Sequence, residues 1–160
     1  MRICSMKTLK TFQISLTPDD TFSHHRLTFL VPDEARRLDI TWNYTPKRLT
    51  DPETCARIAK EAMMRYLPDE DEQKLLFDYH VGTMESLGNQ LCYTLFAEDV
   101  FRGCQIHGRE TILGEDSASY GFLPGIPHGL CTLVLSVFCV YTDHCTVTFQ
   151  IDYDDQGVSR

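Results

Sequence analysis

The sequence is short of the features that mark membrane-spanning, secreted and nucleic-acid-binding proteins. No apolar run reaches the ~18 residues of a membrane span, and the N-terminus has no run long enough for a signal peptide. There are only 15 basic residues against 23 acidic ones, a formal net charge of −8, and no basic stripe is interleaved with aromatic residues. Because such a surface repels a phosphate backbone, we expect neither nucleic acid nor a membrane as a partner.

Motifs of catalysis are missing as well. The chain has no Gly-x-Ser-x-Gly elbow, no glycine-rich phosphate loop and no His-x-His pair that would place a metal inside a β-barrel. The acidic run 69–72 and the pair Asp154-Asp155 lack the alternating oxygen ligands of a calcium loop, so we interpret both as solvated surface. We therefore expect no cofactor and no enzyme activity in this chain alone.

The six histidines are candidate metal ligands. His24 and His25 are adjacent, so on a strand they point to opposite faces and do not grip one ion. Cys104 and His107 have a Cys-x-x-His spacing, but only His144-Cys145 offers a second half-site, so we expect no metal site. A small metal-dependent enzyme that uses His107, His128 or His144 is the third alternative for the function.

Seven cysteines are an odd number, and most of them fall where a small buried hydrophobic residue fits. Five lie inside periodic segments: Cys55, Cys92, Cys131, Cys139 and Cys145. This usage predicts reduced thiols and a cytoplasmic protein.

Alternation of apolar and polar residues is the main structural signal. With 160 residues and 42% apolar content, the chain fits one domain with one core. The alternation predicts short strands separated by turns, at 8–16, 26–31, 38–44, 91–96, 110–113, 130–141 and 145–153. Between 101 and 129 lie six of the nine glycines, which indicates mostly turns and short strand pieces.

The segment 130–153 organises the pattern. Residues 130–141 are apolar on both alternating sets, which predicts a central strand that is covered on both faces. Apolar and polar residues alternate strictly along 145–153, which predicts that one face of this strand is exposed to solvent. The two strands are expected to form an antiparallel hairpin in an all-β sandwich of jelly-roll type with about eight strands.

One stretch has a helical period instead. Asp51 suits the N-cap and Pro52 the first helical position, apolar residues follow at helical spacing, and Pro68 blocks continuation. We expect one amphipathic helix at 51–67, inserted between the third and fourth strands and covering an open sheet end or face. Residues 68–89 are expected to form a long, partly mobile connection, and residues 1–6 and 154–160 to be frayed.

Two sequence motifs stand out as candidates for interaction or structure. In Phe101-Arg102-Gly103, the arginine either binds an anion or a partner's carboxylate, or it hydrogen-bonds loop carbonyls while Phe101 plugs the end of the sandwich and Gly103 takes a positive φ. In the run from Tyr120 to Gly125, Leu-Pro-Gly indicates a tight turn. The candidate residues are Phe101, Arg102, Gly103, Tyr120, Phe122 and Pro124.

The aromatic residues Trp42, Tyr44, Tyr93 and Tyr141 allow a sugar-stacking platform as an alternative. Trp42 and Tyr44 share a strand face with Leu38 and Ile40, which favours core packing for them.

The order of these segments resembles the N-terminal β-domain of bacterial PHP-type metallo-hydrolases (polymerase and histidinol phosphatase family). The resemblance covers most of the chain as an order of strands, and its specific parts are Phe101-Arg102-Gly103 and the run from Tyr120 to Gly125. The family often has tryptophan where this chain has Cys104 and Leu130. The His-x-His signature and later metal ligands of the family's catalytic part are absent from this chain.

The resemblance implies a non-catalytic accessory domain that docks on a PHP-type catalytic domain, in the same chain or in another one. Such a domain requires an exposed apolar patch. The alternative is a carbohydrate- or small-ligand-binding β-sandwich module, whose discriminating feature is an open aromatic-lined groove on which polar groups converge. Self-association as a homo-oligomer is compatible with either function.

Overall fold

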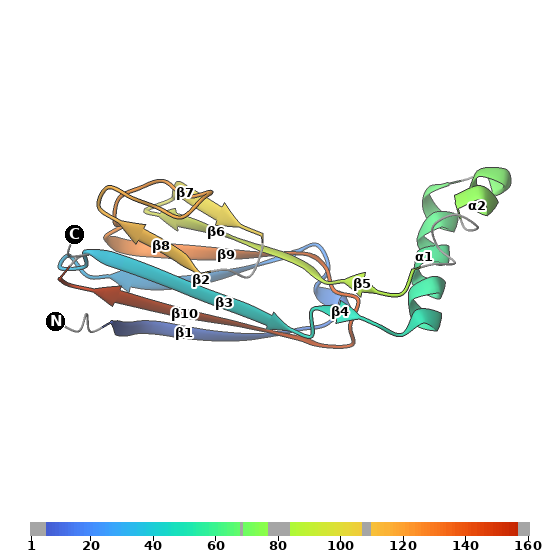
Figure 1. Ribbon diagram of the computed structural model, residues 1–160, viewed down its shortest axis with the longest axis horizontal. Helices are drawn as coiled ribbons and strands as arrows, with labels where there is room; N and C mark the ends of the chain where they lie inside the picture. Colours follow the sequence, from blue (N-terminus) through green and yellow to red (C-terminus); the bar gives the residue numbers. More distant parts are fainter. Residues whose placement is uncertain (1–5, 68, 77–83, 107–109, 157–160) are drawn as a thin grey trace.

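The computed structural model describes residues 6–67, 69–76, 84–106 and 110–156, which form two β-sheets and a helical arm (Figure 1). The strands are β1 (Lys7–Leu16), β2 (Ser23–Val31), β3 (Arg37–Thr45), β4 (Arg48–Leu49), β5 (Leu87–Gly88), β6 (Gln90–Ala97), β7 (Val100–Gln105), β8 (Thr111–Gly114), β9 (Gly129–Cys139) and β10 (Cys145–Asp154). The helices are the 3-10 turn η1 (Pro18–Asp20), α1 (Pro52–Tyr66) and α2 (Glu70–Leu76).

The eight long strands form a sandwich of two four-stranded antiparallel sheets. Sheet A has the order β1-β10-β3-β8, and sheet B has the order β2-β9-β6-β7. The first long strand therefore pairs with the last, the second with the second-last, the third with the third-last, and the middle two with each other. The predicted all-β sandwich with an inserted helix is confirmed.

An aromatic cluster fills the space between the sheets. Trp42 of β3 stacks on Phe149 of β10 with ring centroids 5.7 Å apart, and the ring of Tyr93 of β6 meets both edge-on at 5.3 and 5.5 Å. The Tyr93 hydroxyl is 2.6 Å from the Thr111 hydroxyl of β8, so one buried hydrogen bond joins sheet B to sheet A. Burial raises the pKa of Tyr93 well above its ordinary value. Trp42 is buried and the partly buried Tyr44 packs against the same core, so the prediction of core packing for these two residues is confirmed.

The outer face of β9 differs from the prediction. β9 is central in sheet B, between β2 and β6, and its inward residues Leu133 and Leu135 are fully buried. On its outer face Leu130 is 55% exposed and Phe138 is 48% exposed. Within the described part of the chain, the outer face of β9 is therefore exposed at its two ends, whereas Thr132 of the same face is buried.

β7 is a strand that the alternation did not predict. The tight turn at Glu98 and Asp99, both with positive φ, returns the chain beside β6. Phe96 pairs with Phe101 while Leu95 pairs with Gly103, so Arg102 is an extra residue in a β-bulge. The bulge breaks the two-residue period, and Phe101-Arg102-Gly103 therefore lies on an edge strand rather than in a loop.

The helix α1 begins close to the predicted residue but does not cover a sheet. The Asp51 carboxylate accepts a hydrogen bond from the Thr54 amide at 2.9 Å, and Cys55 is the buried residue of the helix. Figure 1 shows α1 beyond one end of the sandwich, joined to it through the short pair of β4 and β5. The expectation that it covers an open sheet end or face is wrong, because β4 and β5 carry the chain past the ends of the long strands.

The segments expected to be irregular contain more structure than predicted. Within 68–89, α2 and β5 are regular, while 77–83 lies outside the described residues. Asp154, expected to be frayed, ends β10 and is 1% exposed. Its carbonyl accepts a hydrogen bond from the Arg36 amide at 2.7 Å, so the end of β10 lies beside the turn between β2 and β3.

No helix in the described ranges combines the length and the apolar character needed to cross a bilayer.

Two leucines of β9 test which face of this strand is buried. We expect Leu133→Ala to lower the free energy of unfolding by about 2–5 kcal/mol, because Leu133 is fully buried and its removal leaves a cavity. Leu130→Ala on the exposed face should change it by less than about 0.5 kcal/mol. Urea unfolding followed by the fluorescence of the single tryptophan measures both, and equal losses would contradict this assignment of faces.

Candidate functional site

The two sequence motifs meet in space. The Arg102 guanidinium donates from Nη2 to the carbonyl oxygens of Leu123 (3.4 Å), Pro124 (2.9 Å) and Gly125 (2.9 Å). The Leu123 amide donates to the Arg102 carbonyl at 2.8 Å. We call this set of contacts the arginine latch. The structure thus places Arg102 on loop carbonyls, as the structural interpretation of this motif predicted.

Gly103 lets the two segments approach closely. It forms an isolated bridge with Phe122, and its φ is 147°, a conformation that side chains rarely adopt. A Cβ at this position would lie 2.4 Å from the Phe122 ring and 2.5 Å from the Gly121 carbonyl oxygen. Phe122 is 9% exposed and its ring centroid lies 6.0 Å from that of Tyr93, so the loop is anchored in the core.

The other motif residues face solvent. Phe101 is 50% exposed and meets Phe96 edge-on at 6.2 Å, so the expectation that it plugs the end of the sandwich is wrong. Because Phe101 pairs with Phe96, the Phe101 side chain points to the outer face of sheet B and not to the end of the sandwich. Tyr120 is fully exposed, and Pro124 is exposed as well. Gly125 has a φ of 101°, as the third position of a turn with proline at its second position requires.

An apolar group lies beside the latch on the outer face of sheet B. Leu30 of β2 pairs with Leu130 of β9, and they are 66% and 55% exposed. Leu130 is diagonal to Phe96, since Phe96 pairs with Thr132, and Phe96 contacts Phe101. We call Leu30, Phe96, Phe101 and Leu130 the sheet B patch. In the sequence, only the apolar residues on the outer side of 130–141 indicated this patch. Leu30, Phe96 and Phe101 could be assigned to it only once the strand register was known.

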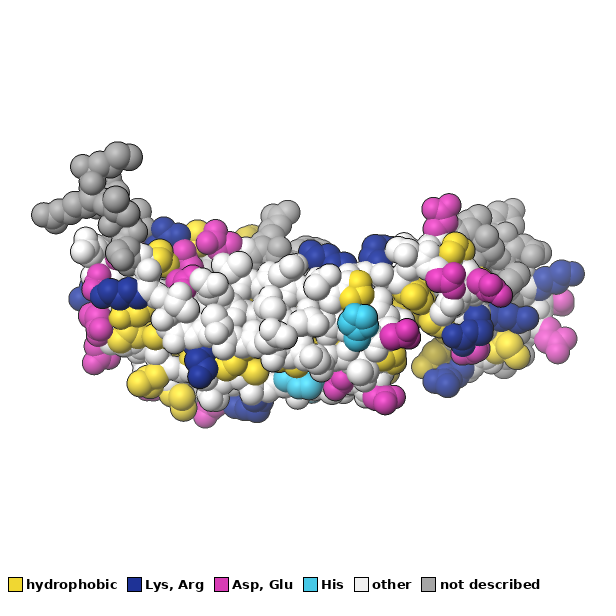
Figure 2. Space-filling view, turned by 90° about the horizontal axis from the view of Figure 1, so that it is seen from below, with side chains coloured by type: hydrophobic (Ala, Val, Ile, Leu, Met, Phe, Trp, Pro, Cys, Tyr) yellow, Lys and Arg dark blue, Asp and Glu magenta, His cyan; other side chains and the backbone are white. Residues whose placement is uncertain are grey.

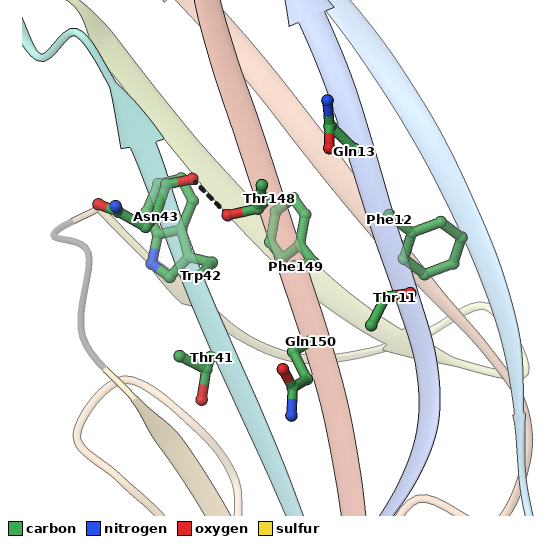
Figure 3. A pocket seen from close by; sticks show the side chains of 9 residues that line it. All are labelled: Thr11, Phe12, Gln13, Thr41, Trp42, Asn43, Thr148, Phe149 and Gln150. Carbon is green, nitrogen blue, oxygen red and sulfur yellow. Dashed lines mark hydrogen bonds between the residues drawn. The ribbon is translucent and has the colours of Figure 1, made fainter.

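The outer face of sheet A is different in character. Nine uncharged polar residues occupy three neighbouring positions on each of three strands, and we call them the polar grid: Thr11, Gln13, Ser15, Thr41, Asn43, Thr45, Thr146, Thr148 and Gln150. The centre of the grid borders a hollow of about 450 Å³ (Figure 3). The rings of Trp42 and Phe149 lie beneath the sheet, 3% and 1% exposed, so they offer no stacking surface there.

A second hollow, of about 580 Å³, lies where the arm joins the sandwich. It is lined by Tyr44, Arg48, Gly88, Asn89, Gln90, Leu91, Ile106 and Phe138. The side chain of Asn89 donates from Nδ2 to the Pro46 carbonyl (2.9 Å) and the Thr142 hydroxyl (2.8 Å). Its Oδ1 accepts a hydrogen bond from the backbone amide of Tyr141 (2.7 Å). Arg48 donates to the Ser86 hydroxyl at 2.9 Å. Both side chains therefore hold the chain together at this junction.

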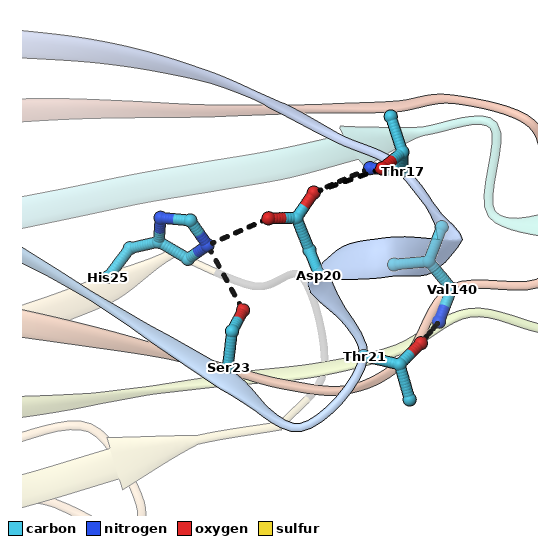
Figure 4. A network of polar contacts seen from close by, with 6 residues as sticks. All are labelled: Thr17, Asp20, Thr21, Ser23, His25 and Val140. Atoms are coloured by element: carbon cyan, nitrogen blue, oxygen red, sulfur yellow. Dashed lines mark hydrogen bonds and ion pairs between the residues drawn. The ribbon is translucent and has the colours of Figure 1, made fainter.

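The histidines do not assemble a catalytic or metal centre among the described residues. His24 contacts the Ser136 hydroxyl on the outer face of sheet B, whereas His25 lies inward near Ser23 and Asp20 (Figure 4). Ser23 and Asp20 both approach Nε2 of His25, at 3.2 and 3.8 Å, whereas a catalytic triad places the nucleophile and the carboxylate on opposite ring nitrogens. These three residues are therefore not arranged as a triad.

Possible metal ligands are also dispersed across the part of the chain that the structure describes, where no three of them gather at one point. Cys104 is exposed on β7, and His107 lies outside the described residues. His128 contacts the Ala35 carbonyl at 3.0 Å, and Cys145, next to His144, is buried.

A scan against protein-family models, a search of curated proteins and a search of solved structures gave no match for this chain. The resemblance to the PHP-associated β-domain therefore rests on the residues of the two motifs and stays a prediction.

The close approach at Gly103 gives a test of the latch. We expect Gly103→Ala to lower the free energy of unfolding by about 2–5 kcal/mol, because the methyl group meets Phe122 and the alanine must adopt a strained φ. The matched control is Gly88→Ala, where the nearest atom would be 3.4 Å away on the Arg48 side chain, with an expected change below about 1 kcal/mol. A Gly103→Ala variant as stable as the wild type would show that the two motifs are not tightly packed.

Cysteine reactivity tests the burial of this region. Burial raises the pKa of Cys131 to about 11, so its thiol stays protonated at pH 8 and forms a thiolate only as the pH rises through that value. Iodoacetamide at pH 8 should modify the exposed Cys104 and spare Cys131 in the folded chain, and denaturant should remove the difference. Peptide mass spectrometry measures both rates, and equal rates in the folded chain would contradict this placement.

Proposed function

We propose that this chain is a non-catalytic docking domain for a PHP-type metallo-hydrolase catalytic domain, in the same chain or in another one, in a cytoplasm that keeps its thiols reduced. We also infer that its sandwich is a jelly roll, because the long strands pair first with last and inward to the middle two. Both motifs that carry the resemblance belong to one local structure, the arginine latch, and this supports the assignment.

The observation that carries the proposal is the exposed apolar start of β9 on the outer face of sheet B. The sequence of β9 has the apolar pattern of a strand covered on both faces, yet Leu130 is 55% exposed. It pairs with Leu30, which is 66% exposed. Single exposed apolar residues are common, whereas a contiguous group on one sheet face is typical of an interaction surface. A partner bound to the sheet B patch would bury these apolar side chains, as the apolar pattern of β9 predicts.

The position of the patch fits a catalytic domain in the same chain. Leu30 lies just before the turn between β2 and β3, and that turn holds the end of β10 through the bond from Arg36 to Asp154. Figure 1 shows the arrowhead of β10 at this end of the sandwich, away from α1. A domain that followed β10 would begin at the same end of the sandwich as the patch, although β10 belongs to sheet A and the patch to sheet B.

The test is a titration with the PHP-type catalytic domain encoded in the same genome, purified as a separate chain. We expect Phe101→Asp to raise its Kd about tenfold or more, because the change places a charge in the centre of a desolvated contact. Phe138→Asp is the matched control: it is an aromatic residue of the same sheet face with nearly the same exposure, 48% against 50%, and lies at the other end of β9. It should leave the Kd unchanged.

Isothermal titration calorimetry measures the affinities, and circular dichroism checks that both variants remain folded. The proposal is wrong if the genome encodes no PHP-type hydrolase, if the wild-type chain does not bind its catalytic domain, or if Phe138→Asp weakens binding as much as Phe101→Asp.

A further inference from the structure

The geometry points to a second binding site, beyond the docking function: the polar grid of sheet A binds a neutral oligosaccharide. The hollow of about 450 Å³ over the grid is bordered by Thr11, Gln13, Thr41, Asn43, Thr148 and Gln150. In Figure 3 these side chains come from three neighbouring strands and surround one depression. Phe12, Trp42 and Phe149 also border the hollow, but their rings belong to the core side of sheet A, so hydrogen bonding by the outer side chains is the interaction that this surface offers.

Charge sets this face apart from the rest of the molecule. The chain has a net charge of −8, and 24% of its residues are charged, yet the nine grid positions hold no charged residue. Figure 2, seen from the side of β1 and β10, shows a broad uncharged area in the middle of the sandwich, with charged side chains gathered toward both ends. A neutral ligand meets the least electrostatic cost here, because the acidic protein repels an anion and the carboxylate that borders the grid, Asp152, already accepts a hydrogen bond from Gln150.

The hydrogen-bonding capacity of the grid is largely unused. Within the described part of the chain, the side chains of Thr11, Gln13 and Asn43 have no hydrogen-bond partner in the protein, and Thr148 makes only a long bond, 3.4 Å, to the Asn43 carbonyl. Gln150 is the exception, since its Nε2 donates to the Asp152 carboxylate at 2.8 Å. Hydroxyl and carboxamide groups both donate and accept. Sugar hydroxyls do the same, so the two surfaces match in charge and in the kind of bond they form.

The grid by itself is too small for a stable interface with a second copy. Three strands about 4.8 Å apart and three rows about 6.7 Å apart cover on the order of 300 Å². A stable protein interface buries about 800 Å² on each partner and has aromatic or arginine anchors at its centre. The centre of the grid is Thr148, flanked by Gln13 and Asn43. An area of this size and character suits a few sugar rings.

The test is an NMR titration of the full 15N-labelled chain with cellohexaose, maltohexaose, xylohexaose and mannohexaose, which differ in linkage and in hydroxyl stereochemistry. At least one of them should give saturable shifts confined to the grid strands, with a Kd on the order of 1 mM, because no ring stacking adds to the hydrogen bonds. Thr148→Glu should weaken this binding about tenfold or more. Thr28→Glu, an exposed threonine on the outer face of sheet B, should leave it unchanged.

Three results would overturn the inference: no saturable shift with any of the four sugars, shifts located at the hollow beside Tyr44 and Phe138 instead, or shifts that Thr148→Glu leaves intact. A fourth contrary result would come from sedimentation of the wild type and the Thr148→Glu variant. If the wild type is a dimer and the variant a monomer, a second copy of the chain occupies the grid. If Thr148→Glu fails to fold, Gln13→Glu on the edge strand β1 replaces it.

Discussion

The contact between the two sheets at Tyr93 is the constraint on which the rest of the structure depends. Its ring meets Trp42 and Phe149 of sheet A, and its hydroxyl pairs with Thr111, so one residue of sheet B fixes the distance between the layers. A buried hydroxyl without a partner would be costly, so Thr111 also fixes where β8 lies. Phe122 packs on the same ring, and through it the core holds the loop that Arg102 binds.

Elements with a regular period were predictable from the sequence, and the others were not. Strict alternation located strands such as β1, β3 and β10, and the cap at Asp51 with Pro52 located the start of α1. β7 was missed because the bulge at Arg102 breaks the period. The direction of α1 was wrong because a helical stripe says only that a face is apolar, and the short strands β4 and β5 decide where the helix points.

The candidate sites divide in the same way. Phe101, Arg102 and Gly103 stood out as a motif, and so did the run from Tyr120 to Gly125, but nothing in their spacing showed that Arg102 binds the carbonyls of that run. The sheet B patch and the polar grid depend on which residues of different strands lie side by side. Cross-strand register sets those neighbours, and a shift of one residue would exchange every inner and outer side chain.

The helical arm lies at one end of the sandwich, and the end of β2 and the start of β9, which carry Leu30 and Leu130 of the sheet B patch, lie at the other (Figure 1). β9 alone has 11 residues, which corresponds to about 36 Å at the usual rise of a strand. A body attached to α1 and another seated on Leu30 and Leu130 would therefore be held apart by a stiff spacer whose length the strands determine. Two partners could be attached to this molecule at once without touching each other.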